Sequence, residues 1–346
     1  MYLRFAKPLL ITLLLVACLQ QTTNATSVPD SKLATETNIQ PTLTSTSTLQ
    51  PVPTPSSTPV SISGTIVFTS ISQIHGGISL LNLRDGSIQN ITGTGSDSVS
   101  WSQDGQWIAF NGEIPPAQNG GVIIQSINLF IIKPDGSEYK RLTQSSQGKS
   151  DVNWSPDGKF LVYVYENQLQ PSDLAIFDFD RNATYLLSSI TGYERHPVWS
   201  PDGKHIAFLH AQNIDQPSEL WIIDADGKNA KRVLEFNVAT SRIDWSPDGQ
   251  WIAFISTKNS QQCGEIYMVR IDGTELTQLT DLPGCATNVT WSPDGKRLAF
   301  VEQKDDFNNF KKEQSQISII DIFENSYITL TLGETWRIND IDWKPN

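Results

Sequence analysis

A short phrase recurs through this chain of 346 residues and constrains its fold more than any other feature. Four copies read Trp-Ser-Pro-Asp-Gly, one reads Trp-Ser-Gln-Asp-Gly, and a truncated one reads Trp-Lys-Pro. In chain order the six copies begin at Trp101, Trp154, Trp199, Trp245, Trp291 and Trp343, at spacings of 53, 45, 46, 46 and 52 residues. A repeat of this length accommodates four short strands with their turns, which is one blade of a β-propeller.

The sequence around each copy supports a four-stranded unit. Alternating apolar segments such as 107–110 follow the phrase, and a second apolar segment such as 220–224 comes later in the unit. Both patterns are typical of strands. Ser-Pro-Asp-Gly itself suits a type I turn, which favours Pro at its second position and Gly at its fourth. We therefore expect each Trp near the end of the first strand of its unit, directly before a reversal.

The two ends of the repeat region are incomplete in complementary ways. Three strand-like segments, 65–69, 78–83 and 88–92, lack a first strand ahead of them, and segment 338–343 lacks the strands that should follow it. We expect the four segments to share one blade, because closure removes an exposed sheet edge. The predicted fold is all-β: a six-bladed β-propeller over residues 63–346, closed by pairing of the C-terminal strand with the N-terminal blade.

With five phrases in register, residues 64–346 resemble the TolB-type (WD40-like) β-propeller family, which is also similar to the propeller domains of prolyl oligopeptidase relatives. The resemblance implies the fold more strongly than any function, because propellers serve as scaffolds, binders and enzymes alike.

The N-terminus has the layout of a bacterial lipoprotein signal. Arg4 and Lys7 precede an apolar segment, 9–17, that is too short for a stable membrane span. Residues 15–18, Leu-Val-Ala-Cys, resemble a lipobox, which implies cleavage after residue 17 and acylation of Cys18. The alternative is an ordinary signal peptide with an incidental cysteine. We expect an exported protein that is lipid-anchored to the bacterial cell membrane.

Residues 18–62 are rich in Ser, Thr and Pro and poor in apolar residues, so we expect a disordered linker.

The overall charge narrows the possible partners. The formal net charge of −12 argues against binding to nucleic acid and against direct adhesion to anionic lipid. The expected partner is an envelope or extracellular protein, with membrane contact through the lipid alone and a monomeric state favoured.

Two further cysteines, Cys263 and Cys285, fall in loops that a propeller places on the same face. The exported location permits a disulfide between them. Two free thiols are the alternative.

Two groups of residues are candidates for ligand or partner binding. The first is a charged loop with two phenylalanines, which is typical of a contact surface: Asp305, Asp306, Phe307, Phe310, Lys311 and Lys312. Alternatively, these phenylalanines fold back on the base of the loop. The second group lies one or three residues before each Trp, where alternation predicts the central channel: Asp151, Asn153, His196, Arg242, Asp244, Asn288, Asp340 and Asp342. Alternatively, these side chains only bond neighbouring blades around water.

Catalytic signals are weak. The four histidines lack metal-ligand spacing, no Gly-x-Ser-x-Gly elbow is present, and no carboxylates are paired at a defined distance. We therefore expect no catalytic residues, no metal site and no cofactor. The predicted function is a non-catalytic, lipid-anchored binding or scaffolding protein of the cell envelope. The alternatives are an envelope glycan or small-ligand sensor, and a carbohydrate-active lyase or hydrolase on a propeller scaffold.

Overall fold

The computed structural model describes residues 54–55, 62–70, 76–93, 96–112, 127–166, 171–188, 190–238, 241–257, 264–282, 284–304, 314–324, 326–330, 332 and 336–346. The chain divides into two units, Met1–Thr44 and Ser45–Asn346, and every described residue belongs to the second. None of the described segments forms a helix with the length and apolar content that a membrane crossing requires.

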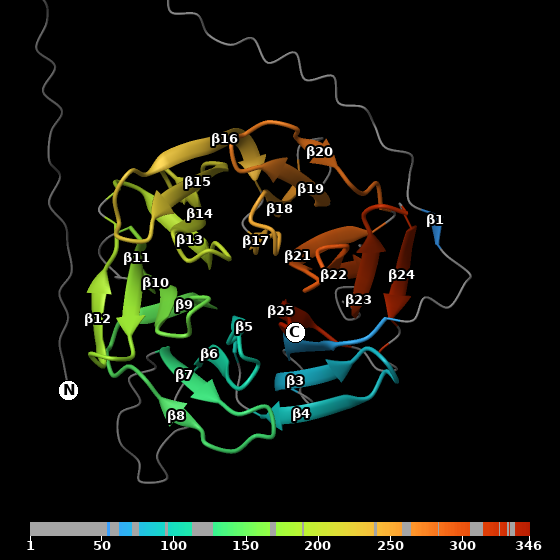
Figure 1. Cartoon of the computed structure of the whole chain (residues 1–346), viewed down its shortest axis with the longest axis horizontal. Helices are drawn as coiled ribbons and strands as arrows, with labels where there is room; N and C mark the ends of the chain where they lie inside the picture. Colours follow the sequence, from blue (N-terminus) through green and yellow to red (C-terminus); the bar gives the residue numbers. More distant parts are fainter. Residues whose placement is uncertain are drawn as a thin grey trace, which may run out of the picture. The chain divides into compact units, whose positions relative to one another are not determined.

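The described strands form six blades around a central axis (Figure 1). The first blade contains β25 (Ile338–Trp343), β2 (Thr65–Ser70), β3 (Gly77–Asn82) and β4 (Ile88–Thr92). The second contains β5 (Val99–Trp101), β6 (Ile108–Gly112), β7 (Asn128–Ile132) and β8 (Lys140–Arg141). The third contains β9 (Gly148–Trp154), β10 (Phe160–Glu166), β11 (Asp173–Asp178) and β12 (Ala183–Leu186).

The remaining blades follow in chain order around the ring (Figure 1). The fourth contains β13 (Tyr193–Trp199), β14 (His205–Ala211), β15 (Ser218–Asp224) and β16 (Lys231–Val238). The fifth contains β17 (Asp244–Trp245), β18 (Trp251–Ser256), β19 (Glu265–Arg270) and β20 (Thr277–Gln278). The sixth contains β21 (Cys285–Trp291), β22 (Arg297–Lys304), β23 (Gln314–Asp321) and β24 (Ser326–Leu330).

The predicted closure is confirmed in the first blade. Antiparallel pairing of β25 with β2 places Trp343 opposite Ile66 and Asp342 opposite Val67. The end of the predicted disordered linker, residues 18–62, makes contacts with the propeller. A short strand, β1 (Thr54–Pro55), pairs in parallel with β24, and Ile62 is buried against the first blade.

The recurring phrase forms the reversal between the first two strands of five blades, as predicted. In the third blade the Gly158 N–H donates to the Ser155 carbonyl over 3.0 Å, and Gly158 has a φ of 70° that favours glycine. The Ser155 hydroxyl donates to Asp157 Oδ1 over 2.7 Å and accepts the Phe160 N–H over 2.9 Å. The Ser and Asp of the phrase therefore bond the turn internally, a role that the turn type alone did not predict.

The core consists of apolar clusters between neighbouring blades. The tryptophan of each phrase is at most 8% exposed. Trp245, for example, packs with Val198 and Ala207 of the fourth blade and with Phe254 of its own. Each Trp therefore fills the wedge between two sheets, where a large apolar side chain stabilises most.

The fifth blade departs from the repeat. Its first strand, β17, has only two residues, and the end of β16 occupies the place where that strand would begin: Val238 pairs with Ser256 of β18. Residues 241–243 therefore lie beside the channel without regular strand pairing.

Candidate functional site: the central channel

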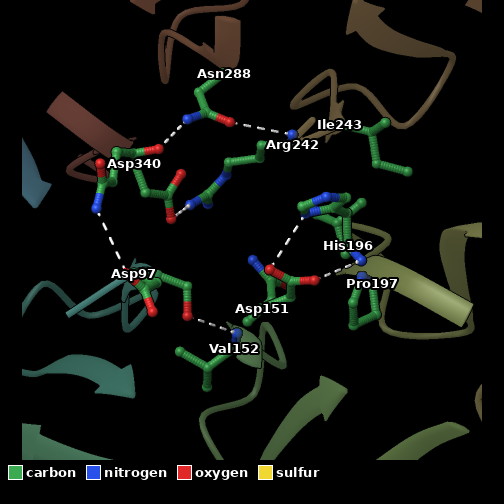
Figure 2. Close-up of a pocket in the computed structure, with 13 residues that line it drawn as sticks. Asp97, Asp151, Val152, His196, Pro197, Arg242, Ile243, Asn288 and Asp340 are labelled. Atoms are coloured by element: carbon green, nitrogen blue, oxygen red, sulfur yellow. Dashed lines mark hydrogen bonds and ion pairs between the residues drawn. The ribbon is translucent and has the colours of Figure 1, made fainter. Parts of the chain in front are cut away.

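Two cavities lie along the axis of the propeller. The first lies at the face of the propeller where the first strand of each blade begins; we call it the loop-face cavity, and its volume is about 70 Å³. The second lies at the opposite face, beside the Trp phrases and their turns; we call it the turn-face cavity, and its volume is about 270 Å³. All eight predicted channel residues line one or both. Asp151, Asn153, His196, Arg242, Asn288 and Asp340 line the loop-face cavity, and Asn153, Asp244 and Asp342 line the turn-face cavity. Figure 2 shows the loop-face cavity with its charged side chains converging from several blades.

Strict alternation does not explain how these side chains reach the axis. Three residues at the position three before Trp have left-handed backbones: Asp151, His196 and Asn288, with φ of 52°, 49° and 47°. Register shifts interrupt the pairing of β9, β13 and β21 at these positions. Asp, His and Asn adopt this conformation more readily than other non-glycine residues, although it still carries strain. β-Bulges of this kind re-aim side chains beside functional sites.

One layer of the channel is a girdle of hydrogen bonds between blades. In five junctions the side chain one residue before Trp accepts the backbone N–H of the next blade's Trp. The pairs are Ser100 with Trp154 at 3.4 Å, Asn153 with Trp199 at 2.9 Å, Asp244 with Trp291 at 2.7 Å, Thr290 with Trp343 at 3.4 Å, and Asp342 with Trp101 at 2.7 Å. These polar groups thus hold the ring together, as the alternative interpretation anticipated.

Val198 breaks this girdle between the fourth and fifth blades. Valine offers no acceptor, and the Trp245 N–H instead bonds the side chain of Asp244, its own neighbour in sequence, over 2.9 Å. The Trp245 indole donates to the Val198 carbonyl over 3.1 Å. This junction consequently relies on different contacts from the other five.

Arg242 spans the channel from this irregular junction. Its guanidinium donates to the Val99 carbonyl over 2.7 Å, to Asp340 over 3.1 Å and to Asp342 over 2.9 Å, and its side chain is only 10% exposed. In Figure 2 the side chain points across the cavity toward Asp340. Arg242 therefore connects the fifth blade to the opposite side of the ring.

The carboxylates around Arg242 outnumber the positive charge that it supplies. Burial raises the pKa of Asp244 to about 7 and the pKa of Asp340 to about 6, and Arg242 opposes both shifts only in part. Burial disfavours the charged form of Arg242 as well, but Asp342 and Asp340 outweigh it and raise the guanidinium pKa. Arg242 thus stays charged, whereas Asp244 and Asp340 take up protons near neutral pH.

His196 and Asp151 form a second ion pair at the loop-face cavity. Nδ1 of His196 lies 3.3 Å from Asp151 Oδ1, and the backbone N–H of His196 donates to Asp151 Oδ2 over 3.1 Å. Burial opposes the charged form of both groups, but their mutual attraction outweighs it. The pKa of His196 is raised and the pKa of Asp151 is lowered. Each group therefore favours the charged form of the other.

Two residues that the sequence analysis missed complete the rim of the loop-face cavity. Asp97 and Asn339 each lie four residues before a phrase tryptophan, one position beyond those selected. Counting one residue further along each repeat would have found them. No three His, Cys, Asp or Glu side chains within the described ranges come together as a metal site.

The other predicted site residues fall largely outside the described ranges. These are Cys18, Cys263 and the whole loop group Asp305, Asp306, Phe307, Phe310, Lys311 and Lys312. Cys285 is described; it is buried and disulfide-bonded.

The family match covers most of the propeller. A sequence model described as "TolB beta propeller domain" matches residues 54–246 and 197–339. The chain belongs to this family. The crystal structure of TolB from Acinetobacter baumannii superimposes with a TM-score of 0.66 over 83% of this chain and 68% of that one, at 15% identity, which shows a shared TolB fold.

Curated relatives of this TolB-type propeller match over shorter stretches. The Tol-Pal system protein TolB of Alcanivorax borkumensis is 34% identical over 74 residues, 21% of this chain and 17% of that protein. Dipeptidyl-peptidase 5 of Porphyromonas gingivalis is 30% identical over 83 residues, 22% of this chain and 12% of the peptidase. This chain spans between 12% and 39% of the length of the curated relatives that it matches. The relatives therefore include a Tol-Pal system protein and a dipeptidyl-peptidase.

Proposed function

We propose that this protein is a non-catalytic binding module of the cell envelope and that a lipid on Cys18 anchors it. Its partner is a protein that docks on the loop face, over the opening of the loop-face cavity, which we call the channel mouth. The main support for the proposal is the set of charged side chains that lines the loop-face cavity in fixed positions. Three strained backbone positions and two ion-pair networks hold these side chains in place. Strain of this kind gathers at binding sites, and rigid charged groups confer specificity on protein contacts.

The chemistry of the mouth favours binding over proton transfer. Asp151 raises the pKa of His196 and so favours the imidazolium over the free base that proton abstraction requires. Arg242 is held by two carboxylates and a carbonyl and stays charged. Groups with fixed charges can recognise complementary charges or amides on a partner without turning it over. The match to the TolB family supports the same role.

Site-specific photo-crosslinking in intact cells tests the docking face. A crosslinking residue replaces the partly exposed Asn339, which lines the loop-face cavity, and a control replaces exposed Lys159 on the turn face. We expect one dominant protein adduct from position 339 and none from position 159. A dominant adduct from position 159 alone, or none from either, would exclude docking over the mouth.

The 305–312 loop can be tested in the same cells. Changing Phe307 and Phe310 together to Ser should weaken the adduct at position 339 if that loop contributes to the contact surface. An undiminished adduct would remove the loop from the proposed interface.

The anchor is tested separately. Growth with a labelled fatty acid should label the wild-type protein and leave Cys18→Ala unlabelled, with the variant released from the membrane fraction. Label retained in Cys18→Ala would reject the lipid, whatever the crosslinks show.

A further inference from the structure

A third cavity opens on the fourth blade, among residues that line neither channel cavity. Its volume is about 740 Å³, within the range of roughly 300–1,000 Å³ that small-molecule sites occupy. Segments 190–191 and 210–217 contribute to its wall together with β15 and β16. We refer to it as the blade-four cavity, lined among others by Ile190, His210, Gln212, Gln216, Trp221 and Glu235.

Trp221 is held in a fixed orientation within this cavity. Its indole N–H donates to Glu219 Oε2 over 3.0 Å, and Arg232 donates to Glu219 Oε1 over 2.8 Å. Arg232 also lies 3.2 Å from Glu235, and the ring of His210 lies 5.0 Å from the Trp221 ring. The side chain is partly exposed despite these contacts. The indole therefore forms a rigid aromatic platform in the wall of a cavity.

His210 packs against Trp221 in the wall of the blade-four cavity. The side chain is 5% exposed, and its Nε2 lies 3.1 Å from the Thr191 carbonyl, so Nε2 carries the proton. Nδ1 is then an acceptor, and it is buried without a hydrogen-bond partner. The bond to Thr191 therefore fixes the imidazole in the cavity wall, against the Trp221 ring.

We propose that the blade-four cavity binds a neutral saccharide. A sugar ring presents C–H groups that pack on the Trp221 face, and its hydroxyls both donate and accept hydrogen bonds. The exposed amides of Gln212 and Gln216 match that dual capacity, and the carboxylates of Glu219 and Glu235 can accept hydrogen bonds from hydroxyl groups. Anionic ligands are disfavoured. Arg232 lies against both carboxylates, but its single positive charge offsets only one of their two negative charges. This site is separate from the proposed protein-docking mouth.

Titration calorimetry on the full chain in a sugar-free detergent tests the proposal. The probes are cellobiose and N,N′-diacetylchitobiose, with choline as a cationic comparison. We expect at least one disaccharide to bind. Gln216→Ala should weaken it about fivefold, the effect of one lost hydrogen bond, and Trp221→Phe should weaken it about as much by shrinking the platform. The matched control Gln106→Ala, an exposed glutamine on the turn face, should bind like the wild type.

Three outcomes would overturn the proposal. The first is no heat from either disaccharide at about 10 mM, where even a site of millimolar Kd fills. The second is binding of choline alone. The third is a disaccharide affinity unchanged in both Gln216→Ala and Trp221→Phe. Unaltered backbone amide spectra of the variants would show that any loss arises in the cavity rather than from unfolding.

Discussion

Five junctions between blades share one hydrogen-bond pattern, whereas the junction between the fourth and fifth blades replaces it. In the five, a polar side chain before Trp bonds the next blade's backbone. In the exception Val198 stands at that position, β17 is cut to two residues, and Arg242 reaches across the channel instead. The difference shows that a closed ring can forgo one local bond when a charged side chain connects its opposite sides.

Removing residues 338–346 should produce the largest effect on this ring. The deletion exposes the edge of β2 and removes the buried Ile338, Ile341 and Trp343 from the core. Losses of several large apolar side chains are expected to lower the thermal midpoint by more than about 10 °C or to abolish folding. Calorimetry of the deletion beside the full chain measures this. An unchanged midpoint would mean that the ring does not depend on its closing strand.

Replacing Arg242 by Met should have the next largest effect. The change leaves Asp340 and Asp342 buried without their counter-charge, which should cost about 3–5 kcal/mol in the free energy of unfolding at neutral pH. Lys228→Met is the matched control, because Lys228 and its partner Asp226 are both exposed and the loss should be much smaller. Urea denaturation compares them. Equal losses would show that the bridge across the channel contributes no more than a surface ion pair.

Asp244 makes the stability of the channel depend on pH. Its pKa rises from 3.8 to about 7 on folding, so the folded protein holds a proton that the unfolded chain has already released. Stability should therefore fall as pH rises from about 4 to about 7. Asp244→Asn keeps an acceptor for Trp291 and should raise the thermal midpoint by a few degrees at pH 8, with little change at pH 4.

Asp202→Asn is the matched control for this experiment. Asp202 lies in an exposed turn, where a hydrogen bond from Ser200 lowers its pKa, so its replacement should not stabilise at pH 8. A higher midpoint in both variants would attribute the gain to lower net charge rather than to Asp244.

The smallest effects should come from single bonds of the girdle. Ser100→Ala removes the acceptor of the Trp154 N–H and should cost about 1 kcal/mol. Val198→Thr adds a hydroxyl at the exceptional junction, where Asp244 already satisfies the Trp245 N–H, so no comparable gain should follow. Thermal scans of both variants decide the point. Stabilisation by Val198→Thr equal to the loss in Ser100→Ala would show that the exceptional junction is merely incomplete.

Local patterns predicted most of the fold. The expected strands 88–92 and 338–343 match β4 and β25, and 65–69 differs from β2 by one residue. These boundaries follow from alternation and turn residues, which act over a few positions. The bulges at Asp151, His196 and Asn288 were not predicted, because Asp, His and Asn tolerate a left-handed backbone without requiring one.

The sequence by itself determined the number of blades, their strand order and the closure of the ring, since a repeated phrase and two incomplete ends permit only one complete arrangement. Tertiary structure alone decided how the channel residues bond to one another. Arg242 bonds Asp340, 98 residues away, and Val99, 143 residues away, and no spacing rule connects them. The blade-four cavity likewise depends on how Trp221 and His210 from adjacent strands are oriented by Glu219 and Thr191. Contacts across a ring depend on its curvature, which a linear pattern does not encode.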